Sequence, residues 1–219
     1  LATRLGLPLP QTTVVELPQD VGMVSIEEKD KKLVKDALIE ATGICSPLFC
    51  FASRFLEEFN VAVGTGFSPE TVENLDAVTG AVVFDTWVFN QDARHFLGTK
   101  SGNKWKLLVF DNDGAFNRID WLLEGDAKDR IRADMNCTKL SEWVRNLVNR
   151  GDLDPFQSHM KALEDDSRWG DIRSLYLELP QEWLSRLIEN PHRCSVQQLL
   201  EKLDHRRKRV QGFFIRKQM

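Results

Sequence analysis

Two polar segments, separated by a turn and a short apolar strand, carry the side chains best suited to chemistry in this chain. The first contains Asn90, Asp92, Arg94 and His95, and the second begins at Asp111 with the sequence Asp-Asn-Asp-Gly. A carboxylate that ends a strand and precedes a tight glycine turn can hold a divalent cation, because oxygen ligands suit Mg²⁺. A second acid just after a helix can accept a proton from a hydroxyl nucleophile or orient it. If Asp92 and Asp111 face one another, the pair fits phosphoryl transfer, in which positioning and charge neutralisation dominate catalysis.

An apolar helix and a short strand are the elements that would position these two acids. Residues 74–90 predict one or two helices with an apolar face, and the run that begins at Ala81 is expected to be buried. A Ser-Gly-Asn-Lys turn follows, and residues 105–110 predict an apolar strand that ends at Asp111. Each acid would therefore follow one of two packed elements.

The sequence favours structural roles for the polar residues just before this helix and within it. Ser68 followed by Pro69 predicts a helix N-cap with a proline at the first helical position. Asp85 lies between Phe84 and Trp87, where an unpaired carboxylate would be costly to bury. A hydrogen-bonded structural carboxylate is the favoured interpretation of Asp85, and a catalytic carboxylate is the alternative.

Three other kinds of site fit the sequence poorly. A calcium-binding loop with Gly114 at its sixth position would have Val109 as its first ligand and would follow a strand instead of a helix. The segment with Gly64 and Gly66 matches a phosphate-binding loop only in its first two glycines. The histidines are scattered and no Gly-x-Ser-x-Gly motif occurs, so a hydrolase triad has no support.

Composition predicts a soluble globular protein. With 219 residues, 42% of them hydrophobic, the chain can bury one core, or one core with a small appendage. No apolar run reaches the roughly 18 residues that a membrane span needs, so a cytoplasmic protein without a membrane partner is the default. Of the four cysteines, only Cys45 and Cys50 lie close together, and reduced, mostly buried thiols are favoured over zinc.

Positive charge is concentrated near the end of the chain. Residues 195–219 hold seven Lys or Arg and only two acids, whereas the whole chain has a formal charge of −4. Apolar residues at helical spacing predict an amphipathic helix whose cationic face lies in solvent. Contact with nucleic acid or an acidic partner is the alternative, and the solvated helix face is favoured over nucleic-acid binding.

The remaining pattern predicts a little β structure followed by a helical domain. Residues 12–17 predict a strand, residues 48–56 a strand or a helix, and residues 27–42 a surface helix. Further helices are predicted over residues 118–124, 139–149, 155–163, 171–177, 180–189 and 195–216. The first residues read as the tail of a helix ended by Gly6 and Pro8, so we expect a fragment whose upstream part is missing. The predicted fold class is α+β, mainly α-helical.

Several short motifs together resemble HipA-like kinases. Residues 84–95 (Phe-Asp-Thr-Trp-Val-Phe-Asn-Gln-Asp-Ala-Arg-His) and 109–116 (Val-Phe-Asp-Asn-Asp-Gly-Ala-Phe) are similar to that family's pattern. The pattern is roughly Asp-x-Trp-x-x-Asn-x-Asp-Arg-His-x-x-Asn, then a strand and Asp-x-Gly-x-x-Phe. Shorter matches, in residues 5–17, 51–56 and the last helices, extend the resemblance over most of the chain. The resemblance implies the C-terminal lobe of a protein-kinase-like fold, with residues 1–66 as a residual N-lobe and hinge region and residues 67–219 as the helical C-lobe.

Functional roles follow from the resemblance position by position. It implies that Asp92 is the catalytic acid or base and that Asp111 binds Mg²⁺. The backbone edge that meets the adenine of ATP would comprise Phe51, Ala52, Ser53 and Arg54. The implied partners are a nucleotide and a protein substrate, and the implied activity is that of a Ser/Thr-type protein kinase.

The chain also departs from the family pattern. Ala93 interrupts the expected Asp-Arg-His, so either Asp92 keeps its role with Arg94 displaced by one, or Ala93 occupies the position of the base. The later metal-binding Asn is replaced by Leu97 or Gly98, and the strand with the phosphate-binding Lys is missing. Loss of such charges lowers phosphoryl-transfer rates by orders of magnitude. The fragment is therefore expected to be weakly active or inactive, and a pseudokinase that only binds partners is the alternative.

Overall fold

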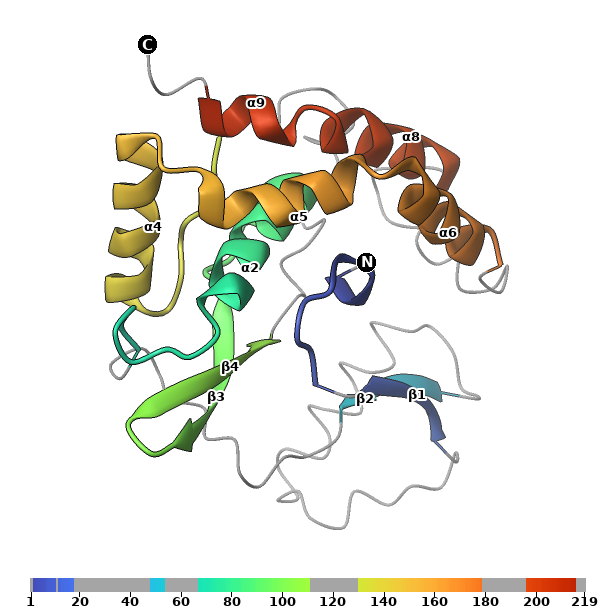
Figure 1. Ribbon diagram of the computed structural model, residues 1–219. Helices are drawn as coiled ribbons and strands as arrows, with labels where there is room; N and C mark the ends of the chain where they lie inside the picture. Colours follow the sequence, from blue (N-terminus) through green and yellow to red (C-terminus); the bar gives the residue numbers. More distant parts are fainter. Residues whose placement is uncertain are drawn as a thin grey trace. The chain divides into compact units, whose positions relative to one another are not determined.

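The computed structural model describes residues 2–10, 12–17, 48–53, 67–110, 130–178 and 196–215 (Figure 1). The chain divides into two compact units. One comprises residues 10–56, and the other comprises residues 1–9 together with residues 57–219.

The smaller unit contains one antiparallel pair of strands. Strand β1 (Thr12–Leu17) pairs with β2 (Leu48–Ser53), with Thr12 opposite Ser53 and Leu17 opposite Leu48. The strand predicted over residues 12–17 is confirmed. Residues 48–56 were predicted to form a strand or a helix, and residues 48–53 form a strand. The helix predicted over residues 27–42 lies outside the described residues.

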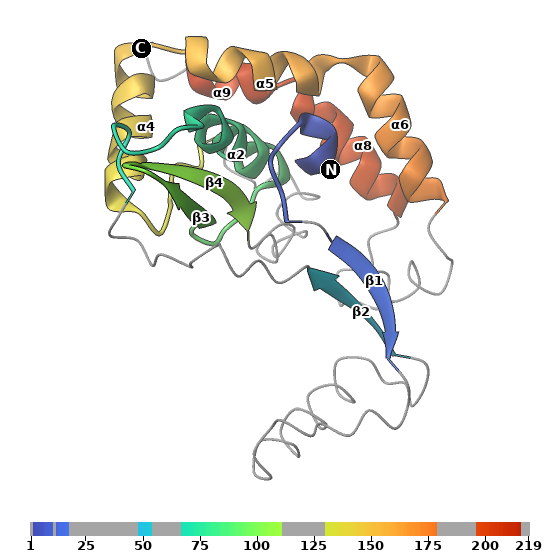
Figure 2. The same ribbon diagram turned by 60° about the horizontal axis from the view of Figure 1, so that its bottom comes forward.

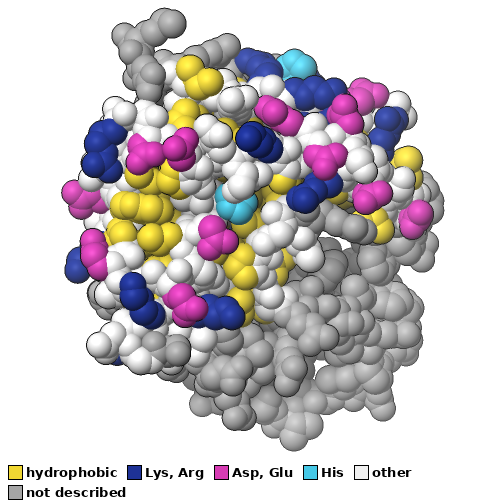
Figure 3. Space-filling model, in the orientation of Figure 1, with side chains coloured by type: hydrophobic (Ala, Val, Ile, Leu, Met, Phe, Trp, Pro, Cys, Tyr) yellow, Lys and Arg dark blue, Asp and Glu magenta, His cyan; other side chains and the backbone are white. Residues whose placement is uncertain are grey.

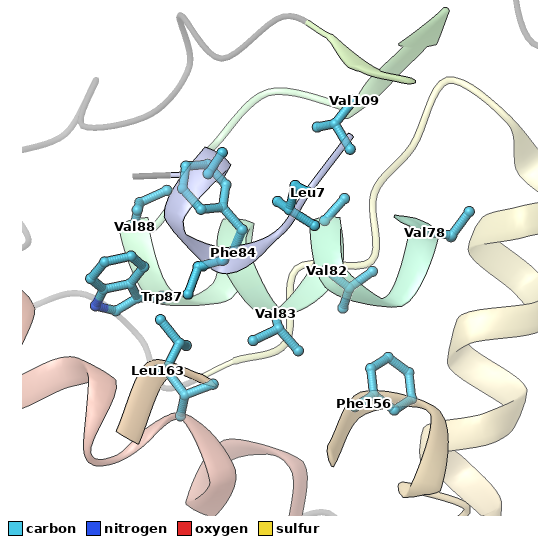
Figure 4. Close-up of a cluster of buried hydrophobic side chains, with 14 of the residues drawn as sticks. Leu7, Val78, Val82, Val83, Phe84, Trp87, Val88, Val109, Phe156 and Leu163 are labelled. Carbon is cyan, nitrogen blue, oxygen red and sulfur yellow. The ribbon is translucent and has the colours of Figure 1, made fainter. Parts of the chain in front are cut away.

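Helix α2 (Leu75–Val88) is the centre of the larger unit. All of its residues from Ala77 to Val88 are buried, as expected for a helix that is packed on every side. Figure 4 shows its apolar side chains between Leu7 and two side chains of α5 (Asp154–Glu164), Phe156 and Leu163. The buried helix predicted from residue 74 onward is confirmed as a single helix.

The predicted N-cap at Ser68 is wrong, because the backbone that follows it pairs with a strand. Residues 68–71 form a turn closed by the Thr71 N–H, which donates to the Ser68 carbonyl at 2.9 Å. The Trp105 N–H donates to the Thr71 carbonyl at 2.7 Å. The Trp105 carbonyl accepts from the Glu73 N–H at 2.8 Å. Helix α2 therefore starts only at residue 75.

A β-hairpin follows α2. Strand β3 (His95–Ser101) pairs antiparallel with β4 (Lys104–Phe110), and Gly102 adopts a left-handed φ of 59° in the turn between them. The predicted turn and the predicted strand over residues 105–110 are confirmed. Strand β3 was not predicted, because its second half, from Gly98 to Ser101, has no apolar residue. Its Gly98 lies so close to the Phe67 ring that an added Cβ would come within 2.8 Å of it.

Helices make up the rest of the larger unit. They are the 3-10 helix η1 (Ala2–Leu5) and the α-helices α4 (Thr138–Arg150), α5, α6 (Asp166–Leu177), α8 (Val196–Arg207) and α9 (Val210–Ile215). Helices were predicted at each of these places in residues 139–216. Helix α6 begins earlier than predicted because the carboxylate of Asp165 caps it, accepting from Ser167 N–H at 2.9 Å. The helices predicted over residues 118–124 and 180–189 lie outside the described residues.

The last predicted helix is divided in two, and its cationic face is not wholly in solvent. Figures 1 and 2 both show α8 and α9 lying against the layer formed by α5 and α6. Arg206 and Arg207 are 6% and 2% exposed, so the prediction of a solvated basic face is wrong for these two residues. Lys208 and Arg209, at the break between the helices, are exposed. Figure 3 shows charges of both signs interspersed on the face seen in Figure 1.

The fold is mixed α+β and mostly helical, as predicted. The described residues form six α-helices and two two-stranded antiparallel sheets. No helix in the described ranges is long and apolar enough to cross a membrane. Cys137 is a buried free thiol whose Sγ donates to the Phe67 carbonyl, in agreement with the expected reduced state of this residue.

Candidate functional site

A buried ion pair connects α2 to the start of β3. The Asp85 carboxylate and the Arg94 guanidinium are 3% and 0% exposed, and Arg94 Nε donates to Asp85 Oδ2 at 2.9 Å. Arg94 Nη2 donates to the other carboxylate oxygen, which also accepts from Asn90 Nδ2 at 3.0 Å. Since charged groups bonded in this way are not available to a ligand, Asp85 is confirmed as the structural carboxylate that the sequence favoured.

The loop of residues 90–94 carries Asp92 on the surface. It begins after Phe89, a buried non-glycine residue with a left-handed φ of 54° that ends α2 and turns the chain. Asn90 is buried, and its Oδ1 accepts from Asp92 N–H at 3.2 Å. The Asp92 side chain is exposed, and so is its neighbour Ala93. An exposed carboxylate on an anchored backbone can accept a proton from a hydroxyl group or orient that group.

The segment of residues 130–136 holds this loop from its other side. Arg132 Nη2 donates to the Gln91 carbonyl at 2.6 Å, and Arg132 N–H donates to Thr86 Oγ1 at 3.1 Å. Arg94 N–H donates to the Asp134 carbonyl at 2.9 Å, and its carbonyl accepts from Asn136 N–H at 3.0 Å. The Asp92 loop is thus bonded both to α2 and to the segment before α4.

Arg94 also links this loop to the end of β4. Its Nη1 donates to the carbonyl of Phe110 at 2.9 Å. Phe110 is the residue before Asp111, and Asp111 itself lies outside the described residues. The loop with Asp92 and the strand end that leads to Asp111 are therefore held by one guanidinium.

The predicted adenine edge belongs to the smaller unit. Phe51, Ala52 and Ser53 pair on β2 with β1, whereas Arg54 lies outside the described residues. Asp92 belongs to the larger unit. The proposed adenine edge and the proposed acid/base thus come from separate compact parts of the chain.

Arg132 interacts electrostatically with Asp92 and with several other charged residues. Burial, together with the nearby Arg130, lowers the pKa of Arg132 from its usual value, and the negative charges of Asp134, Asp85 and Asp92 oppose this shift. Asp134 also lies 3.3 Å from Arg145 on the surface of α4. Asp92 thus lies in the field of a cation that is itself partly desolvated.

The described residues do not by themselves form the predicted magnesium site. Oxygen ligands suit Mg²⁺, and Asp92 is an exposed carboxylate that fits this chemistry. At the two positions where the resemblance to HipA-like kinases predicts a metal-binding Asn, Leu97 pairs opposite Leu108 and the buried Gly98 opposite Leu107, so neither position offers a side-chain oxygen. Within the described ranges, no group of three or more His, Cys, Asp or Glu could hold a metal ion. Asp111, the predicted ligand, is not among these residues.

Arg132 is the residue near Asp92 that the sequence did not reveal. It stands in Ile-Arg-Ala-Asp-Met, where the alternation of apolar and charged residues favours an exposed arginine. In the structure it is 6% exposed. Its partners Thr86 and Gln91 are 46 and 41 residues away in sequence, so no local pattern marks it.

In comparisons with known proteins, no family model matches the chain, and no curated protein or solved structure matches it either. The function is therefore inferred from the residues and their geometry.

Proposed function

We propose that the chain carries the helical lobe of a HipA-like, ATP-dependent phosphotransferase of the Ser/Thr protein kinase type. The observation that best supports this proposal is the position of Arg94. Its guanidinium bonds to Asp85 of α2 and to the Phe110 carbonyl, and so joins the Asp92 loop to the strand end before Asp111. Phosphoryl transfer requires the acceptor hydroxyl and the metal-bound phosphate to be held in fixed relative positions.

The proposal gives each residue a separate role. Asp92, exposed on its anchored loop, orients the acceptor hydroxyl and receives its proton. Asp111 holds Mg²⁺, which when bound neutralises charge on the transferring phosphoryl group. The backbone of residues 51–54 receives the adenine. Asp85, Asn90 and Arg94 hold the loop and take no part in the chemistry.

A kinase-like binding module without catalysis is the second candidate. Strand β3 favours it, because the positions of the expected metal-binding amide, Leu97 and Gly98, are paired in the hairpin. An amide introduced at Gly98 would also collide with the rings of Phe67 and Trp105. A second metal ligand is thus lacking at that place, and nucleotide binding could persist without phosphoryl transfer.

Calorimetric titration of ATP into the whole chain, with and without Mg²⁺, distinguishes the two candidates. For a kinase we expect Mg²⁺ to tighten ATP binding and Asp111→Asn to abolish that tightening. Asp92→Asn should leave ATP affinity unchanged and lower the weak phosphoryl transfer expected of the wild-type chain by about 10²- to 10⁴-fold, because it removes the group that receives the proton.

Asp152→Asn is the matched control, since Asp152 is an exposed acid in the turn between α4 and α5. It should behave like the wild type. ATP binding that is indifferent to Mg²⁺, or no ATP binding, would contradict the kinase proposal and favour the binding module.

A further inference from the structure

Four arginines are buried in the described part of the chain, and three of them have a clear structural role. Arg94 bonds to Asp85 and to the Phe110 carbonyl. Arg206 donates from Nε and Nη2 to the Thr86 carbonyl, and from Nε to the Trp87 carbonyl as well. Arg207 donates to Asp204, Asp166 and the Leu163 carbonyl. Each of these three arginines forms hydrogen bonds with acceptors on other elements, and each has more than one acceptor.

Arg132 is less well satisfied. Its Nη2 donates to the Gln91 carbonyl at 2.6 Å and lies 3.5 Å from the carboxylate of Asp134, whose side chain is 55% exposed. Its buried Nε has no hydrogen-bond acceptor among the described residues. A desolvated guanidinium with an incomplete set of partners costs free energy. Fold stability alone therefore does not favour an arginine at this position.

Two hydrogen bonds hold the Gln91–Asp92 peptide, and Arg132 makes one of them. The Gln91 carbonyl and the Asp92 N–H are the two ends of one planar peptide unit. Arg132 Nη2 donates to the carbonyl end, and Asn90 Oδ1 accepts from the N–H end at 3.2 Å. The peptide that sets the direction of Asp92 is therefore held at both ends.

Arg94 does not duplicate this role. Its guanidinium is directed to Asp85 and to the end of β4. Arg132, by contrast, is the buried arginine that bonds to the residue before Asp92, and the charge of Asp92 favours its cationic form.

We propose that Arg132 is a positioning residue for Asp92, which fixes the Gln91–Asp92 peptide through its bond to the Gln91 carbonyl. The inference rests on the proposed function, since the direction of Asp92 matters only if Asp92 meets an acceptor hydroxyl. Small displacements of a catalytic group can lower a rate by about 10²-fold, which would explain an incompletely paired arginine at this place.

The test compares Arg132→Gln and Arg132→Lys with Arg145→Gln in the whole chain. Arg145 also lies within ion-pair distance of Asp134 but is 55% exposed on α4, so it is the matched control. Amide hydrogen exchange at residues 91–93 reports the order of the loop, and the NMR resonance of the Asp92 N–H reports its bond to Asn90. Amides of α4 serve as the internal reference.

We expect Arg132→Gln to speed exchange at residues 91–93 about tenfold relative to α4 and to shift the Asp92 resonance. Arg132→Lys, which can still donate to the Gln91 carbonyl, should restore much of the protection, and Arg145→Gln should change neither signal. Equal changes in the loop and in α4, an unshifted Asp92 resonance, or failure of both Arg132 variants to fold would overturn the inference in favour of a purely structural arginine. Since none of these signals needs ATP, they are independent of the Mg²⁺-dependent ATP binding that tests the proposed function.

Discussion

At the scale of single residues, the Asp85–Arg94 pair determines how the Asp92 loop is held. Its acidic member could be predicted from the sequence, because a carboxylate between Phe84 and Trp87 must be paired if it is buried. Its basic member could not, since no local pattern in the sequence marks Arg94 as the partner of Asp85. The structure shows Arg94 bonded to Asp85 and Asp92 exposed.

Substitution Asp85→Asn should lower the free energy of unfolding by about 3–5 kcal/mol, because it leaves the Arg94 cation buried without its counter-charge. Urea unfolding measures this change. Arg168→Gln is the control: the Arg168–Asp165 pair is about half exposed on both sides, so its loss should cost at most about 1 kcal/mol. A cost for Asp85→Asn as small as that of the control would contradict the role given to the pair.

His159 of α5 makes stability depend on pH. Burial lowers the pKa of His159, an effect opposed by the charge of Asp76 and by a hydrogen bond to its backbone. Because the folded pKa lies below that of the unfolded chain, the neutral ring stabilises the fold fully above about pH 6.5. That contribution is lost as the pH falls below this value and through the folded pKa.

Urea unfolding of the wild type and of His159→Gln at several pH values between 7.5 and 5 measures this effect. The loss of stability on acidification should be smaller in His159→Gln. His205→Gln, which replaces an exposed histidine of α8, should keep the wild-type dependence. Identical pH dependence of all three proteins would show that His159 is not responsible.

At the scale of elements, helix α2 packs too closely on its neighbours to admit a larger residue at Gly80. An added Cβ there would clash with the Leu7 side chain and come within 2.7 Å of His159 Cε1. Gly80→Ala should therefore destabilise the protein by about 1–3 kcal/mol in urea unfolding, despite the better helix propensity of alanine.

Gly170 in α6 provides the matched substitution, because an added Cβ at this helical position meets nothing within 4 Å. Gly170→Ala should stabilise the protein by about 0.5–1 kcal/mol. If both substitutions change stability in the same direction, close packing at Gly80 is not the controlling factor.

The success of prediction from sequence differed among the elements for physical reasons. Helices α2, α4 and α5 were predictable, because apolar residues recur at helical spacing or fill the whole segment. Strand β3 was missed because Gly98 and the polar residues that follow it resemble a loop. The rings of Phe67 and Trp105 lie against Gly98, and the sequence does not show this contact. The N-cap predicted at Ser68 was wrong because Thr71 and Glu73 bond to Trp105, more than 30 residues away.

At the scale of the whole molecule, Arg206 connects the end of the described chain to its centre. Helix α2 has no basic residue in its last turn, and Arg206 donates instead to the carbonyls of Thr86 and Trp87 at that end of the helix. A cation is favourable there because the helix dipole is negative at its C-terminal end. The helical spacing of apolar residues predicted that Arg206 lies on a solvated face. The sequence could not reveal its acceptors, because they lie about 120 residues away.

Arg206→Gln should lower the free energy of unfolding by about 2–4 kcal/mol, because buried carbonyls lose charged donors and the stacking on Phe213 is removed. Lys202→Gln, an exposed neighbour on α8, should change stability by less than about 0.5 kcal/mol. Thermal and urea unfolding followed by circular dichroism measure both. Equal effects of the two substitutions would rule out Arg206 as the anchor of α2.

The bond between Arg206 and α2 has a consequence for the order in which the protein can be completed during synthesis. Trp87 leaves the ribosome 119 residues before the guanidinium that bonds to its carbonyl. At a translation rate of about 5–20 residues per second, this interval is about 6–24 s. During that time the end of α2, and the Asp92 loop that starts there, lack one of their supports. The C-terminal end of α2, where the proposed catalytic loop begins, therefore gains its full set of hydrogen bonds only after α8 has been made.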